Sequence, residues 1–357
     1  MERTLFGKPA RYEGGLREVA PGVFAWLQPN GEFGESNAGV VVGEGEALLV
    51  DTLWDPVLTR RMLDSIGAQI SAPISTLVNT HSDGDHVWGN QLLTGTDIVA
   101  THAAARVIRD ETPAALQRFK ALAPRLRAVG GLPLPIIGKL RLPLVPRLPL
   151  RELGEYVENM LRPYDFSEVR VTPPTSEFTG ELTLEIGGRE VRLIEVGPAH
   201  TPGDLIVHVP DASVVVAADV LFTGVTPVMW AGPTSRWIAA LGRILELDAD
   251  VVVPGHGPVS GNAEVAALRD YLAWVDAAAR PRLAAGRSVS RTARELLFGD
   301  EYGAAPWAKW DSPERIVLTI ATIDRHRRGA PGPIGTRERL TLFAHVASLA
   351  REVEGRP

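Results

Sequence analysis

The sequence predicts an α/β fold followed by a helical region. Short apolar runs rich in Val, Ile and Leu recur up to about residue 260, and each is closed by Gly, Pro, Asp or Asn, as buried strands are. A helical pattern lies between two of these runs, so strand, helix and strand follow one another, which is typical of α/β organisation. From Ala263 onward the chain is rich in Ala and Arg and has helical periodicity.

The predicted strands form two groups. The first comprises residues 23–27, 38–42, 47–50 and 74–79, and the second comprises residues 182–186, 191–196, 205–209, 213–217 and 250–253. A helix over residues 56–66 places Val57, Leu58, Met62 and Ile66 near the spacing of one buried face. Later helices are predicted up to residue 280 and over 289–297, 313–325 and 336–351, where they fit packing on the core or on a second subunit of a homodimer.

The domain organisation follows from this pattern. We expect an α/β domain over residues 1–262 and a helical C-terminal region over residues 263–357. Residues 111–166 interrupt the alternation of strand and helix patterns with Pro-Leu runs such as those at 132–135 and 148–150, which indicates an insertion of two or three helices. The insertion is either a surface excursion or a lid over the site, and the lid is favoured because long insertions in compact domains are often functional.

Composition excludes several classes of protein. The net charge is −6 and the isoelectric point is near 5.8, so no basic excess points to nucleic acid or to an anionic membrane surface. The chain has no cysteine, which leaves His, Asp and Glu as the strong metal ligands. Neither a signal peptide nor an apolar run of membrane-spanning length is evident, so we expect a soluble, cytoplasmic protein with a small-molecule substrate.

Potential metal ligands gather where the predicted strands end. His81, Asp83, Asp85 and His86 lie in the loop directly after the strand at 74–79, and Gly84 is expected to allow the bend that brings the last two around. A single His or Asp in such a loop is usually a cap or a turn residue, whereas four together favour a site. Further candidates follow other strands, and functional groups in open α/β sheets converge at strand ends; these candidates are His200, Asp219 and His256.

The four segments resemble the metallo-β-lactamase superfamily over residues 22–261, whose signature is H-x-H-x-D-H followed by a lone His, a bridging Asp and a final His. The resemblance implies a four-layer αββα sandwich with the helical insertion and the helical C-terminal extension. It also implies that Asp51 orients a ligand or the loop from behind the metal ligands. The implied ligands are His81, Asp83 and His200 for a first ion, Asp85, His86 and His256 for a second, and Asp219 between them.

One position departs from the signature, because Asp83 stands where the family has its second histidine. A carboxylate there adds negative charge and a harder ligand, which favours Zn²⁺, Fe or Mn. Either Asp83 ligates and the centre is dinuclear, or Asp85, His86 and His256 hold a single Zn²⁺. The dinuclear form is favoured because the other ligands of the first position remain.

The resemblance implies a metal-dependent hydrolase in which a metal-activated water attacks the substrate and Asp85 orients that water or shuttles its proton. We expect cleavage of an ester, thioester, lactone or amide bond of a small, apolar substrate. The alternative is a non-hydrolytic enzyme of the same fold, either an iron-dependent oxygenase or oxidoreductase or a cyclase or lyase, and a binding protein with a relict site ranks last.

Two alternative roles are open for several other residues. Pro227, Met229 and Trp230 are expected either to line the pocket or to pack in the core, and Arg315 either to reach the site or to contact a partner subunit. Isolated histidines are usually hydrogen-bonded or exposed, and four remain without a predicted role; these are His102, His208, His326 and His345.

Overall fold

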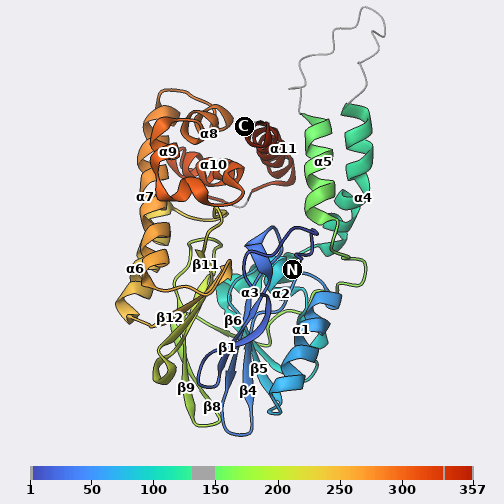
Figure 1. Cartoon of the computed structure of the whole chain (residues 1–357), viewed down its shortest axis with the longest axis vertical. Coiled ribbons are helices and arrows are strands. Elements are labelled where there is room, and N and C mark those ends of the chain that lie inside the picture. The colour runs from blue at the N-terminus through green and yellow to red at the C-terminus, as the bar shows by residue number, and fades with distance from the viewer. Residues whose placement is uncertain (1–2, 131–148, 333, 356–357) are drawn as a thin grey trace, which may run out of the picture.

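Two β-sheets stack face to face between outer layers of helices in the computed structural model, which describes residues 3–130, 149–332 and 334–355. In Figure 1 the helices α1 (Pro56–Gln69) and α6 (Thr234–Leu247) lie on opposite outer sides of the paired sheets. This four-layer arrangement confirms the predicted αββα sandwich.

The first sheet has seven strands in sequential order, β1-β2-β3-β4-β5-β6-β7. The strands up to β4 pair antiparallel, whereas β4 to β7 pair parallel. Their bounds are β1 Gly15–Ala20, β2 Val23–Leu27, β3 Ala38–Val42, β4 Ala47–Val50, β5 Ile74–Asn79, β6 Asp97–Thr101 and β7 Ser176–Phe178.

The second sheet has five strands in the order β12-β11-β10-β9-β8. The pair β11 and β12 is parallel and the other pairs are antiparallel. Their bounds are β8 Glu181–Ile186, β9 Arg189–Glu195, β10 Leu205–Val209, β11 Val214–Phe222 and β12 Val251–His256.

Side-chain alternation explains why the sheets are covered on both faces. Along β2, Val23, Ala25 and Leu27 lie in the apolar cluster between the two sheets. Phe24 and Trp26 point the other way and pack in the cluster under α1. Because successive strand residues face opposite sides, an all-apolar strand needs a partner layer on each side.

Helices α2 (Gly84–Val87) and α3 (His102–Asp110) lie near the first sheet, and α7 (Asn262–Ala284) follows α6 on the outer side of the second. The C-terminal helices share one hydrophobic cluster with the second sheet and α6, so they extend that layer. Their bounds are α8 Val289–Leu297, α9 Asp300–Ala304, α10 Ile316–Arg327 and α11 Thr336–Glu354. Short 3₁₀ turns span Pro29–Gly31, Asn90–Leu92, Pro210–Ala212, Pro306–Lys309 and Pro313–Arg315.

The described part of the predicted insertion is a helical hairpin of α4 (Pro113–Gly130) and α5 (Leu150–Leu161). In Figure 1 the hairpin projects away from the sheets, and α5 packs beside α11. The Pro-Leu run at 132–135 lies outside the described residues. Among the described residues no helix is both long enough and apolar enough to cross a membrane.

Many predicted boundaries agree with the structure. The strands β2, β3, β4, β5 and β10 and the helix α8 have the predicted limits, whereas α1 continues three residues past the predicted end at Ile66, to Gln69. One difference concerns the site, because β11 does not end near Ala217 but continues to Phe222. Asp219 therefore lies inside a strand, not at its end as the sequence pattern predicted.

Candidate metal centre

The candidate ligands come from both sheets and meet at one end of the sandwich. His81 follows β5 after one residue, Asp83 to His86 lead into and through α2, and His256 is the last residue of β12. His200 lies in the loop between β9 and β10. The two sheets are joined at this end, since the Leu205 amide donates to the Thr80 carbonyl oxygen over 2.8 Å.

The first group of ligands is His81, Asp83 and His200, whose ligating atoms all lie within 4.8 Å of one another. His200 Nε2 is 3.1 Å from Asp83 Oδ2, while His200 Nδ1 donates to the Val228 carbonyl oxygen over 2.6 Å. Because the Nδ1 proton is committed to that carbonyl, Nε2 is the nitrogen that faces the ligand group.

The second group is Asp85, His86 and His256, again with ligating atoms within 4.8 Å. Asp85 Oδ2 is 3.4 Å from His256 Nε2 and 3.9 Å from His86 Nε2. The Asp85 side chain is 15% exposed, whereas the His86 side chain is fully buried. Asp85 is therefore the member of this group that solvent reaches best.

Asp219 lies between the two groups. Its Oδ1 is 3.1 Å from His86 Nε2, and its Oδ2 is 3.3 Å from His200 Nε2 and 3.5 Å from His256 Nε2. Gly255 on the adjacent strand β12 makes this position possible, because a Cβ there would come within 1.8 Å of Asp219 Oδ1. A carboxylate in contact with both groups has the position that a bridging ligand requires.

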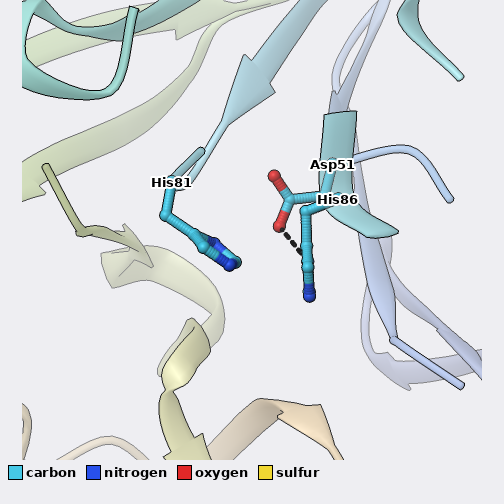
Figure 2. A group of neighbouring side chains, drawn as sticks. All are labelled: Asp51, His81 and His86. Atoms are coloured by element: carbon cyan, nitrogen blue, oxygen red, sulfur yellow. Dashed lines mark hydrogen bonds and ion pairs between the residues drawn. The ribbon is translucent and has the colours of Figure 1, made fainter. Parts of the chain in front are cut away.

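Asp51 supports the ligands from behind. Its Oδ1 accepts from the Thr80 amide over 2.8 Å, and its Oδ2 accepts from the Thr80 hydroxyl over 2.6 Å and lies 3.0 Å from His86 Nδ1. The Thr80 hydroxyl in turn lies 2.9 Å from His81 Nδ1. Figure 2 shows the contact between the Asp51 carboxylate and the His86 ring, and the centres of the His81 and His86 rings are 4.3 Å apart. Asp51 therefore has the orienting position that the resemblance implies.

The electrostatics of the centre are those of a cation site. Burial opposes protonation, but the carboxylates of Asp219 and Asp85 raise the pKa of His86 well above its usual value and also raise the pKa of His256. Burial likewise opposes protonation of His200, but the adjacent Asp83 raises its pKa to about 10. A metal ion would replace these protons, so metal binding would release them and tighten as the pH rises.

The residues fit a metal ion on a second observation. His81 Nε2 is buried and has no hydrogen-bond partner, and the buried His86 Nε2 and Asp219 Oδ1, although 3.1 Å apart, are not aligned for a hydrogen bond with each other. Burial is also the main cause that lowers the pKa of His81, which favours the neutral imidazole that ligates metals. Buried polar atoms without partners are rare in native proteins, and three that face one point indicate a shared cation. The nitrogen and oxygen donors suit Zn²⁺, Fe or Mn.

Sequence reasoning missed two contacts that fix the ligand loop. The Trp230 indole donates to Asp83 Oδ2 over 2.9 Å, and the Ser36 hydroxyl donates to the Asp85 carbonyl oxygen over 2.7 Å. Trp230 was expected in the pocket wall or the core, but nothing in the sequence paired it with Asp83. The sequence singled out Gly84 because glycine allows a backbone bend. In the structure Gly84 starts α2, and it is the close packing that requires glycine, because a Cβ there would come within 2.5 Å of the Trp88 ring.

The remaining sequence candidates have other contacts. Met229 is fully buried in the core, and Arg315 is buried with its guanidinium 4.9 Å from the Phe33 ring centre. Among the four unassigned histidines, His326 contacts the Ala231 carbonyl oxygen at 2.6 Å, and His102 is exposed and paired with Glu177.

The chain belongs to the metallo-β-lactamase superfamily, whose profile matches residues 31–256. This confirms the resemblance inferred from the four ligand segments.

Two curated proteins are similar over short segments. The linear primary-alkylsulfatase of Pseudomonas sp. (strain ATCC 19151) is 32% identical over 113 residues, which are 29% of this chain and 21% of that protein. The 2,4-dinitroanisole O-demethylase subunit alpha of Nocardioides sp. (strain JS1661) is 37% identical over 90 residues, 24% of this chain and 26% of that protein.

Solved structures share the fold at low sequence identity. An inverting sec-alkylsulfatase from Pseudomonas sp. superposes with a TM-score of 0.63 at 16% identity, over 88% of this chain and 50% of that one. A metallo-beta-lactamase from Pontibacter korlensis superposes with a TM-score of 0.52 at 16% identity, over 73% of this chain and 99% of that one. These likenesses support the fold and leave the substrate open.

Proposed function

We propose that the chain is a metal-dependent hydrolase that cleaves an ester, thioester, lactone or amide bond of a small, apolar substrate. The observation that carries this proposal is the pair of three-residue ligand groups on either side of Asp219. Their ligands would hold two ions, with Zn²⁺ as the expected metal and Fe or Mn as the alternatives.

Metal ions bound by these residues would polarise the scissile bond and lower the pKa of water toward about 7. The chain's own contribution is to place the acid–base group. Asp85 is partly exposed and lies next to His256, so its carboxylate can orient the attacking water and take its proton. Asp51 contacts His86 Nδ1 and so keeps the His86 ring in one orientation. No side-chain nucleophile is required.

Aromatic side chains pack beside the first ligand group, and the partly exposed rings of Trp230 and Phe33 favour an apolar substrate. Trp230, which donates to Asp83, has its ring centre 6.4 Å from that of Phe343, and Phe343 lies 6.2 Å from Phe33. Partly exposed aromatic rings bind apolar groups through burial and ring contacts.

Two guanidinium groups border the same aromatic side chains. Arg315 lies 4.9 Å from the centre of the Phe33 ring, and Arg339 lies 5.5 Å from that of Trp230. Arg315 is buried, so the exposed Arg339 is the group that could offer positive charge to an anionic ester with an apolar chain. An alkyl sulfate is therefore the second candidate substrate, and the similarity to a linear primary-alkylsulfatase favours it.

The test is metal content and metal-dependent hydrolysis on the same preparation. Protein purified without chelator is expected to contain about two Zn²⁺ or Mn²⁺ ions per chain and to hydrolyse members of a nitrophenyl ester and alkyl sulfate panel. Chelation should abolish turnover, and added Zn²⁺ should restore it. His86→Ala should lose metal and turnover, whereas the exposed-histidine control His102→Ala should lose neither.

Other results would change the assignment. Bound iron with substrate-dependent oxygen uptake would support the oxygenase alternative. If the protein contains no bound metal, and if adding Zn²⁺, Mn²⁺ or Fe²⁺ produces no hydrolysis, the proposal is contradicted altogether.

A further inference from the structure

An extended segment, residues 227–232, lies between the ligands and helix α10. Three alternate carbonyl oxygens of this segment accept hydrogen bonds from α10. Thr319 donates to Pro227 over 3.4 Å, Thr322 donates to Met229 over 2.6 Å, and His326 Nε2 contacts the Ala231 oxygen at 2.6 Å. Residues three and four positions apart share one face of a helix, so a single face of α10 makes all three contacts.

The other side of the same segment contacts the first ligand group. The Val228 carbonyl oxygen accepts from His200 Nδ1, and the Trp230 indole donates to Asp83 Oδ2 over 2.9 Å. The Trp230 and Ala231 amides both donate to the His200 carbonyl oxygen, over 2.8 and 3.0 Å. The segment therefore contacts two of the three candidate ligands of the first ion. We call residues 227–232 the strap.

The indole contact bears on the unusual ligand at position 83. An indole N–H only donates, and a carboxylate only accepts when ionised. An imidazole that ligates through one nitrogen carries a proton on the other, so that nitrogen would oppose the Trp230 N–H. Trp230 is thus suited to Asp83 and unsuited to the histidine of the family signature.

We propose that the strap, held by α10, is a positioning element for the first metal site, and that Trp230 and Asp83 act as a matched donor–acceptor pair within it. The inference rests on the proposed metal centre. It assigns a role in the site to a helix outside the segment that matches the superfamily profile. Groups behind metal ligands commonly change metal affinity by about 10- to 100-fold when mutated.

The first test removes the indole N–H and keeps a ring. In Trp230→Phe, the Zn²⁺ affinity of the first site should fall by about 10- to 100-fold while that of the second site stays unchanged. The affinities are measured by competition with a chromophoric chelator. In the Co²⁺-loaded variant, the absorption bands of the ion in the first site should differ from those of the wild type. The matched control is Trp274→Phe, which removes an indole contact of 2.8 Å to the Glu301 carboxylate on the C-terminal helices and should change neither affinity.

The second test removes one contact between α10 and the strap. Thr322→Val keeps the shape of the buried side chain and loses the hydroxyl that donates to Met229, whereas Thr322→Ser retains a hydroxyl. The valine variant should lower the Zn²⁺ affinity of the first site alone, and the serine variant should keep the wild-type affinity. Thermal unfolding of the metal-free proteins checks that each variant is folded.

The outcomes separate this inference from the proposed function. A wild-type protein that binds no metal contradicts the metal centre itself. A wild-type protein that binds metal while Trp230→Phe and Thr322→Val leave both affinities unchanged, or weaken both sites equally, contradicts the positioning role of the strap and leaves the metal centre standing.

Discussion

The substitution Asp51→Asn should weaken both metal sites, because Asp51 determines the protonation of two histidines. Its Oδ2 accepts from the Thr80 hydroxyl and contacts His86 Nδ1. Since the Thr80 hydroxyl proton goes to Asp51, the Thr80 oxygen accepts from His81 Nδ1. Both imidazoles therefore carry their proton on Nδ1 and present Nε2 without a proton to the metal centre.

An asparagine reverses this pattern. Its oxygen is retained by the Thr80 amide, which donates to Oδ1 over 2.8 Å, so the NH₂ group takes the place of Oδ2. The amide would donate to His86 Nδ1 and to the Thr80 hydroxyl, and that hydroxyl would then donate to His81. Both histidines would move their proton to Nε2, the nitrogen that should bind metal.

The expected magnitude is about 10- to 100-fold in Zn²⁺ affinity at each site, or about 1.4 to 2.8 kcal/mol. The backbone should tolerate the change, because Asp51 has φ of 66° and asparagine is among the residues that adopt this left-handed conformation most readily. The assay is Zn²⁺ competition with a chromophoric chelator, with separate dissociation constants for the two ions.

The control is Asp55→Asn. Asp55 is also a buried carboxylate, and it accepts from the Leu58 amide over 2.8 Å and from the Asp165 amide over 3.2 Å. Asparagine also caps helices well, so this variant should retain metal affinity. Unchanged Zn²⁺ affinities in Asp51→Asn, or loss at one site alone, would refute the reasoning from protonation.

Three further predictions concern stability and packing. Burial raises the pKa of Glu35 to about 7, so the folded protein favours the neutral form of this side chain. The stability that Glu35 contributes is therefore present below about pH 4.5 and is lost as the pH rises through 7. In denaturant titrations of metal-free protein, the free energies of unfolding at pH 5 and pH 8 should differ less in Glu35→Gln than in the wild type. Met62→Ala should lower the free energy of unfolding by about 2 to 5 kcal/mol, since Met62 is fully buried under the first sheet, and a loss below about 1 kcal/mol in urea denaturation would contradict that packing. Gly255→Ala should displace Asp219 and lower metal content, whereas Gly242→Ala, where a Cβ meets nothing within 4 Å, should keep the metal by plasma mass spectrometry; equal metal content in both would argue against the close approach at Gly255.

The sequence predicted elements best where local pattern and burial agree. The strands β3 and β4 are short, apolar and closed by turn residues, and their predicted limits were confirmed. The strand β1 was missed because its sequence, GLREVA, is polar and only partly buried. The extension of β11 past Ala217 was missed because residues up to Phe222 are held by pairing with β12, which local sequence cannot specify.

The sequence by itself determined which residue types and strand exits can form a metal centre. His81, Asp85 and His86 lie close in the chain, so their proximity needs only a short loop. The tertiary structure decided the rest, because the contact between Asp83 and Trp230 joins residues 147 positions apart and requires the folded sheets. His326 lies still further along the chain and contacts the strap only because α10 packs on the second layer. Sequence patterns record local chemistry, whereas the partner of a donor or acceptor depends on which layers pack together.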